Sequence, residues 1–175
     1  APEECRETYM LNGGWDRLLA RVSRIADALP KARSITIGYR RLRDILGNEL
    51  LSRKKFRVLS HLVRNEVPEN LSEYAALGRL LASIRKEYAP RTLKGLRERL
   101  LSDREEEVLG AIAEINVYGG LRSRRVAVQL LSATGEGRAA DIVVPGATPL
   151  EIEVSYLAGG QPWRLSELLR IRPEQ

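Results

Sequence analysis

The sequence has little of what disulfide-bonded, zinc-binding and membrane proteins need. It contains one cysteine, Cys5, and one histidine, His61, so it can form neither an internal disulfide nor a four-ligand Cys/His zinc site. No apolar run approaches the roughly 20 residues that span a bilayer. The first residues, APEECRE, lack the basic and then apolar segments of a secretory signal. We therefore expect a folded, cytoplasmic protein that does not bind membranes.

The positive charge is concentrated in one segment of the chain. Residues 31–66 carry a net charge of +7, whereas the whole chain of 175 residues carries +6. A localised basic surface attracts a polyanion because binding releases condensed counterions. The charge therefore predicts a nucleic-acid interface, with double-stranded DNA as the expected partner and a solvated helix face as the alternative. Its candidate binding residues are Arg40, Arg41, Arg43, Arg53, Lys54, Lys55, Arg57 and Arg64.

Apolar residues at helical spacing predict an N-terminal helical region that ends near Pro90. Helices are expected at 15–29, from 37 to the Gly47-Asn48 pair, at 53–66 and at 70–88. Gly47 and Asn48 suit a tight turn, and Ser52 can cap the basic helix that follows. This arrangement resembles a helix-turn-helix domain, whose second helix enters the major groove of DNA. An ordinary three-helix packing unit is the alternative.

The sequence after Pro90 changes from helical to strand-like patterns. Short helices are expected at 93–101 and from a capping box at 102–105 to about Val117. Three apolar runs follow at 125–134, 139–146 and 150–158, and the short connections between them favour an antiparallel meander. A closing helix is expected at 162–170. The fold class is therefore α+β, with a helical domain at 1–90 and a second domain at 91–175.

Acidic residues gather on the last two expected strands. Alternation along the third strand places Glu151 and Glu153 on one face. Asp141 opens the neighbouring strand, and a hairpin centred near Ala147 brings it opposite them. Carboxylates packed together require a proton or a cation, and oxygen ligands suit Mg²⁺ or Mn²⁺. The alternative is that these residues form the solvated face of the sheet.

This pattern resembles the PD-(D/E)XK, or restriction-endonuclease-like, nuclease superfamily. The residues that carry the resemblance are Asp141 in GRAADIVVP and the element Glu151-Ile152-Glu153, which holds glutamate at the family's lysine position. The resemblance implies that Asp141 and Glu151 bind Mg²⁺ or Mn²⁺, which activates water to hydrolyse a phosphodiester bond. A glutamate on the preceding helix, Glu114 or Glu107, would complete the catalytic site.

Three functions follow from these patterns. The first is a magnesium-dependent endodeoxyribonuclease, nucleoid-associated if the source is prokaryotic. The second is a non-catalytic DNA-binding regulator or architectural protein whose C-terminal part serves assembly. The third, an RNA-binding factor, is less favoured because the chain has one phenylalanine and no platform for stacking bases. The short segment after Ala158 indicates either a trimmed nuclease fold or one that a second subunit completes in a homodimer.

The remaining composition bears on the source of the chain. The basic residues are 24 arginines and 5 lysines, and cysteine, asparagine and glutamine are scarce. This composition fits a thermophile, and it equally fits a GC-rich genome.

Overall fold

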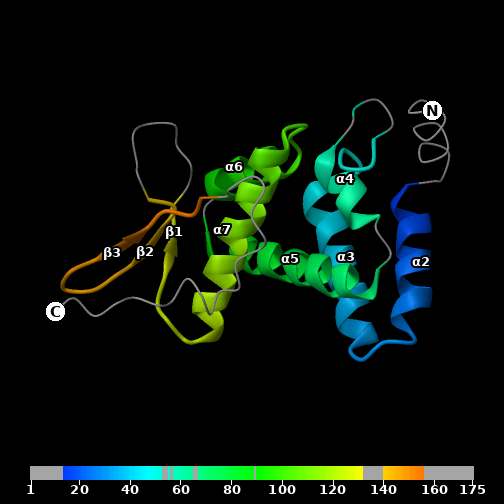
Figure 1. The fold of residues 1–175 in the computed structure, drawn as a ribbon, viewed down its shortest axis with the longest axis horizontal. Helices are drawn as coiled ribbons and strands as arrows, with labels where there is room; N and C mark the ends of the chain where they lie inside the picture. Colours follow the sequence, from blue (N-terminus) through cyan, green and yellow to red (C-terminus); the bar gives the residue numbers. More distant parts are fainter. Residues whose placement is uncertain are drawn as a thin grey trace.

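The computed structural model describes residues 14–52, 55, 57–64, 67–88, 90–131 and 140–155. These residues form six helices and a three-stranded antiparallel sheet beside the last helix (Figure 1). This is the helix-rich α+β arrangement that the sequence predicts. None of the described helices is both long and apolar enough to cross a membrane. The elements are α2 (Trp15–Ala26), α3 (Ala32–Leu46), α4 (Val58–Val63), α5 (Pro68–Glu87), α6 (Pro90–Leu100), α7 (Glu105–Ser123), β1 (Gln129–Leu130), β2 (Ile142–Val144) and β3 (Leu150–Ile152).

Helices α3 and α5 form the centre of the helical part and touch through their backbones. A Cβ atom added to Gly38 would lie 2.2 Å from the carbonyl oxygen of Ala75, and one added to Gly78 would lie 2.0 Å from the oxygen of Gly38. Only glycine fits at such a crossing. Helix α3 begins at Ala32, earlier than predicted, and ends before Gly47, whose positive φ of 67° stops the helix.

The segment after α3 differs from the prediction. Residues 47–57 separate α3 from α4, whereas a helix-turn-helix motif has a turn of about three or four residues. The chain turns at residues 47–51 as predicted, and Leu50 and Leu51 are buried in the core. Helix α4 has six residues and begins after Arg57, and Ser52 does not cap it. The prediction of a long basic helix that starts at Arg53 directly after the turn is therefore wrong.

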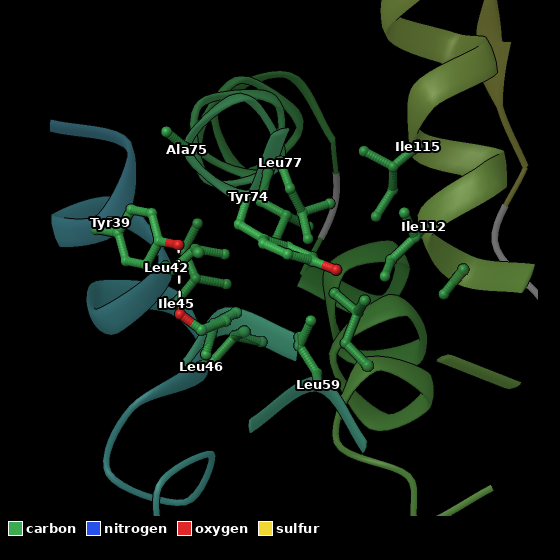
Figure 2. Close-up of a cluster of buried hydrophobic side chains, with 14 of the residues drawn as sticks. Tyr39, Leu42, Ile45, Leu46, Leu59, Tyr74, Ala75, Leu77, Ile112 and Ile115 are labelled. Carbon is green, nitrogen blue, oxygen red and sulfur yellow. Dashed lines mark hydrogen bonds between the residues drawn. The ribbon is translucent and has the colours of Figure 1, made fainter. Parts of the chain in front are cut away.

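One hydrophobic cluster extends across the predicted domain boundary at Pro90. Pro90 is the first residue of α6, and buried side chains from Trp15 to Ile142 belong to one cluster. Figure 2 shows part of this cluster, where residues of α3, α4, α5 and α7 point toward one another. Within it the hydroxyl of Tyr39 donates a hydrogen bond to the carbonyl oxygen of Val63, 3.3 Å away. The helices on both sides of residue 90 therefore share their buried surface.

Two helix starts also differ from the predicted capping boxes. Helix α5 begins with Pro68 at its first turn, so the expected cap Asn70 lies within the helix. Proline is favoured there because its missing N–H would have no partner in the first turn. Helix α7 begins at Glu105, and the Ser102 hydroxyl accepts a hydrogen bond from the N–H of Arg104 just before it.

The sheet has the strand order β1-β2-β3, so the predicted antiparallel meander is confirmed. Gln129 lies opposite Val143, and Val143 lies opposite Glu151. The strands are shorter than predicted, and residues 145–151, which include the start of β3, are exposed. The closing helix predicted at 162–170 lies outside the described residues.

Tyr88, which follows α5, ties the sheet to the helices. Its hydroxyl accepts a hydrogen bond from the N–H of Leu130 at 3.2 Å and donates one to the oxygen of Val128 at 3.4 Å. Its ring meets that of Tyr118 edge to face, with centroids 6.0 Å apart. The first strand is therefore held to the end of α5 and to α7.

Candidate nucleic-acid interface and carboxylate pair

Helix α3 presents a basic face to solvent. Burial of residues such as Tyr39 and Leu42 against α5 fixes which side of the helix faces outward. On the outward side Arg33, Arg40 and Arg41 are exposed. Positions 33, 40 and 41 fall on one face of a helix because seven and eight residues complete about two turns. Three of the basic residues therefore share one surface, called here the α3 face.

The charge of the α3 face is only weakly offset by its one acid. Asp44 lies 3.9 Å from the Arg41 guanidinium and 3.5 Å from that of Arg43. All three side chains are well exposed, and exposed ion pairs contribute between zero and about 1 kcal/mol. Phosphate groups can therefore replace Asp44 as the partner of these arginines at little cost.

Arg57 has a different role from the one predicted for it. Its side chain is only 11% exposed. It donates hydrogen bonds to the carbonyl oxygen of Leu101 and to Glu49, whose carboxylate oxygen is 3.2 Å away. Arg97 of α6 forms an ion pair with the same carboxylate at 2.7 Å and also donates a hydrogen bond to the carbonyl oxygen of Ile45 at 3.1 Å. Arg57 therefore ties the connection after α3 to α6, and it is too enclosed to face a ligand.

The predicted binding residues that follow α3 do not form one basic helix, and they do not belong to the α3 face. Lys55 is exposed in the connection before α4, and Arg64 is half-buried directly after that helix. His61 is exposed on α4. Arg53 and Lys54 lie outside the described residues.

Glu114 is the most deeply buried carboxylate of the described chain. Its side chain is 2% exposed, on the inner side of α7. The guanidinium of Arg99, from the last turn of α6, lies 2.5 Å from one of its oxygens. Burial raises the pKa of Glu114 above its ordinary value, the hydrogen bond and charge of Arg99 oppose this shift, and the charge of Asp141 adds to it. The charge of Asp141 therefore acts on Glu114, but burial is the main cause of the shift.

Asp141 departs from the regular ladder of the sheet. Ile142 lies opposite Ile152, so a regular ladder would place Asp141 opposite Glu153. Instead the N–H of Asp141 donates to the oxygen of Ile152 at 2.9 Å, and its carboxylate accepts a hydrogen bond from the N–H of Val154 at 2.8 Å. The irregular bonding is confined to the β3 side, because the oxygen of Asp141 still accepts a hydrogen bond from the N–H of Leu131 at 2.8 Å. The carboxylate of Asp141 is therefore held by the backbone that follows β3.

Glu151 and Glu153 remain exposed on β3 and directly after it. Among the residues that the structure describes, no three Asp, Glu, His or Cys side chains are grouped as metal ligands. Glu107, the other candidate on α7, is paired with Arg104 at 3.0 Å near the start of that helix. Of the predicted catalytic residues, Glu114 is buried and influenced by the charge of Asp141, whereas Glu151 and Glu153 are exposed.

One oxygen of each of these two carboxylates, Glu114 and Asp141, already has a donor. One oxygen of Glu114 is bonded to Arg99, and one of Asp141 is bonded to the backbone of Val154. Arg99 thus supplies positive charge beside Glu114. Sequence reasoning missed Arg99, because it lies on a different helix and no spacing links it to Glu114.

Comparisons with protein-family models, curated proteins and solved structures find no match to this chain. The resemblance to the PD-(D/E)XK superfamily therefore stays a prediction.

Proposed function

We propose that the protein binds double-stranded DNA through the α3 face. The observation that supports this proposal is the exposure of Arg33, Arg40 and Arg41 on one side of a helix whose only acid is Asp44. Guanidinium groups match phosphate oxygens with two parallel hydrogen bonds. A helix of 15 residues is about 22 Å long, which is enough to lie along several phosphates. This binding does not depend on a helix-turn-helix geometry.

The test measures affinity for a fluorescent duplex against salt concentration. Replacing Arg40 and Arg41 with alanine removes two phosphate contacts, so the slope of log affinity against log salt becomes shallower by about 1.8. Affinity at about 0.15 M salt falls roughly 30-fold for the same reason. Lys94→Ala is the matched control, because Lys94 is an exposed cation on α6 paired with Glu98 at 3.8 Å. An unchanged slope in the double variant contradicts the proposal.

A second candidate function is hydrolysis of DNA at the carboxylate pair. It is favoured by the burial of Glu114, on α7, and by the influence of the Asp141 charge on it. A divalent cation there would compete with Arg99 for Glu114. Without such a cation the protein is a non-catalytic DNA-binding regulator or architectural protein.

Incubation with supercoiled and branched DNA in Mg²⁺ or Mn²⁺ separates these two functions. An endonuclease gives cleavage that Asp141→Ala and Glu114→Gln abolish while binding is retained. The exposed residue Glu98 provides the control variant Glu98→Gln. Intact DNA that is nevertheless bound by the wild-type protein rules out the nuclease and leaves the regulator.

A further inference from the structure

Helix α7 ends in a conformation that normally requires glycine. The N–H of Val126 donates to the oxygen of Leu121 at 3.1 Å, and the N–H of Arg125 donates to that of Arg122 at 2.9 Å. These two bonds define a Schellman motif, in which the residue after the helix is left-handed and is usually glycine. Arg125 occupies that position with a φ of 61°. A side chain at such a φ is strained, and residues that retain strain often serve a function.

Arg125 belongs to a group of cations at the end of α7. Arg122, Arg124 and Arg125 are all exposed at the end of α7. Glu87 of α5 lies 2.6 Å from Arg122 and accepts a hydrogen bond from the Tyr118 hydroxyl at 3.0 Å. These bonds hold the last turn of α5 against α7. The surface is called here the α5–α7 basic end, and its cations are Arg122, Arg124 and Arg125.

The charge of the α5–α7 basic end is not cancelled by its own segments. Residues 74–91 and 115–131 contain one acid, Glu87, and it is already engaged by Arg122 and Tyr118. The side chain of Arg125 makes no hydrogen bond or ion pair with the described part of the chain. The Arg124 guanidinium donates to the oxygen of Gly120 at 3.1 Å, which fixes its position. Within the described residues, the surface thus combines a guanidinium that is fixed in position with one that has no partner.

We propose that the α5–α7 basic end is a second surface that contacts DNA phosphates, separate from the α3 face. This inference extends the proposed DNA binding but depends on different residues. A membrane or a protein partner fits less well, because both use large apolar anchors. The large apolar side chains exposed among the described residues are Ile37, Val67 and Leu150, and none of them belongs to this surface.

Lys31 is a second cation whose backbone is left-handed. Lys31 is the other described non-glycine residue with positive φ, at 69°, and it directly precedes α3. Both strained positions are therefore occupied by cations next to a basic surface. A chain that needed only the fold would be more stable with glycine at each of them.

Arg125→Gly tests the inference, because a structural role and a binding role predict opposite outcomes. Glycine relieves the backbone strain, so the melting temperature stays the same or rises. Loss of one phosphate contact lowers the affinity for a duplex about fivefold at roughly 0.15 M salt and makes the salt slope shallower by about 0.9. Arg125→Asn, which also tolerates a left-handed backbone, should behave in the same way.

The controls separate this inference from the proposed function. If the wild-type protein does not bind the duplex, the proposed DNA binding and the second surface are both overturned. If binding depends on Arg40 and Arg41 but Arg125→Gly, Arg125→Asn and Arg124→Ala all leave affinity and slope unchanged, only the second surface is overturned. Loss of affinity in Arg125→Gly together with an equal or higher melting temperature supports it.

Discussion

The two basic surfaces are built on different kinds of helix contact. The α3 face belongs to a helix that touches α5 through the backbones of Gly38 and Gly78. The α5–α7 basic end belongs to a helix that meets α5 through a side chain, since a Cβ on Gly119 would lie 2.6 Å from the end of Leu80. A backbone oxygen cannot move aside, whereas a leucine side chain can change rotamer. The helix contact beneath the α3 face therefore allows only glycine, whereas the contact beneath the α5–α7 basic end can accept a larger residue.

The largest loss of stability is expected from a substitution at the backbone contact between α3 and α5. Gly38→Ala places a methyl group against the backbone of Ala75, so the helices must separate and the free energy of unfolding should fall by about 3 kcal/mol. Denaturant unfolding measures this loss. Gly119→Ala is the matched control: Leu80 can shift, and alanine gains up to about 1 kcal/mol of helix propensity, so its stability should stay close to that of the wild type. Equal losses in the two variants would contradict the comparison.

A smaller loss of stability is expected when Glu49, which follows α3, or Glu87, at the end of α5, loses its charge. Glu49→Gln leaves the enclosed guanidinium of Arg57 without its carboxylate and weakens Arg97, which should lower the unfolding free energy by about 1 kcal/mol. Glu87→Gln removes an exposed pair with Arg122 and should change it by about 0.5 kcal/mol or less. Thermal unfolding of the two variants measures the difference. If Glu87→Gln is the more destabilising, the α5–α7 contact is the more rigid of the two.

The smallest expected effect is on the pH dependence of stability, and it comes from Glu114. This residue is buried, whereas Glu49 and Glu87 are exposed. Its pKa in the folded protein is raised above the ordinary value of 4.5. Folding therefore favours the protonated form, so its stabilising contribution is full below pH 4.5 and is lost as the pH rises through the raised pKa. The stability of the wild type relative to Glu114→Gln should thus fall as the pH rises. Unfolding curves over about pH 4 to 7 measure this difference, and parallel curves for the two proteins contradict the pKa shift.

Local patterns predicted much of the fold. The helix of Trp15, the long helix ending before Tyr88, the helix containing Glu114 and the antiparallel meander all follow from apolar spacing and short connections. The connection at 47–57 could not be predicted in this way, because Leu50 and Leu51 read equally well as part of a helix. Their burial depends on contacts with residues far away in the sequence.

The candidate sites show the same limit. The α3 face was predictable because its charges lie close together in the sequence. The α5–α7 basic end was not, because the contact of Glu87 with Arg122 joins distant segments and acids elsewhere, such as Glu105, balance its cations in the total charge. The pairing of Glu114 with Arg99 likewise depends on how α6 packs against α7. The irregular bonding at Asp141 is a tertiary detail that strand alternation alone does not contain.

The hydroxyl of Tyr88 has a consequence for assembly of the sheet. It occupies the N–H of Leu130 and the carbonyl of Val128 on the side of β1 that faces away from β2. These are the groups to which a strand of another molecule would bind. Molecules add edge to edge without limit only when both edges of a sheet accept a partner, so the Tyr88 hydroxyl opposes such growth at the described edge of β1.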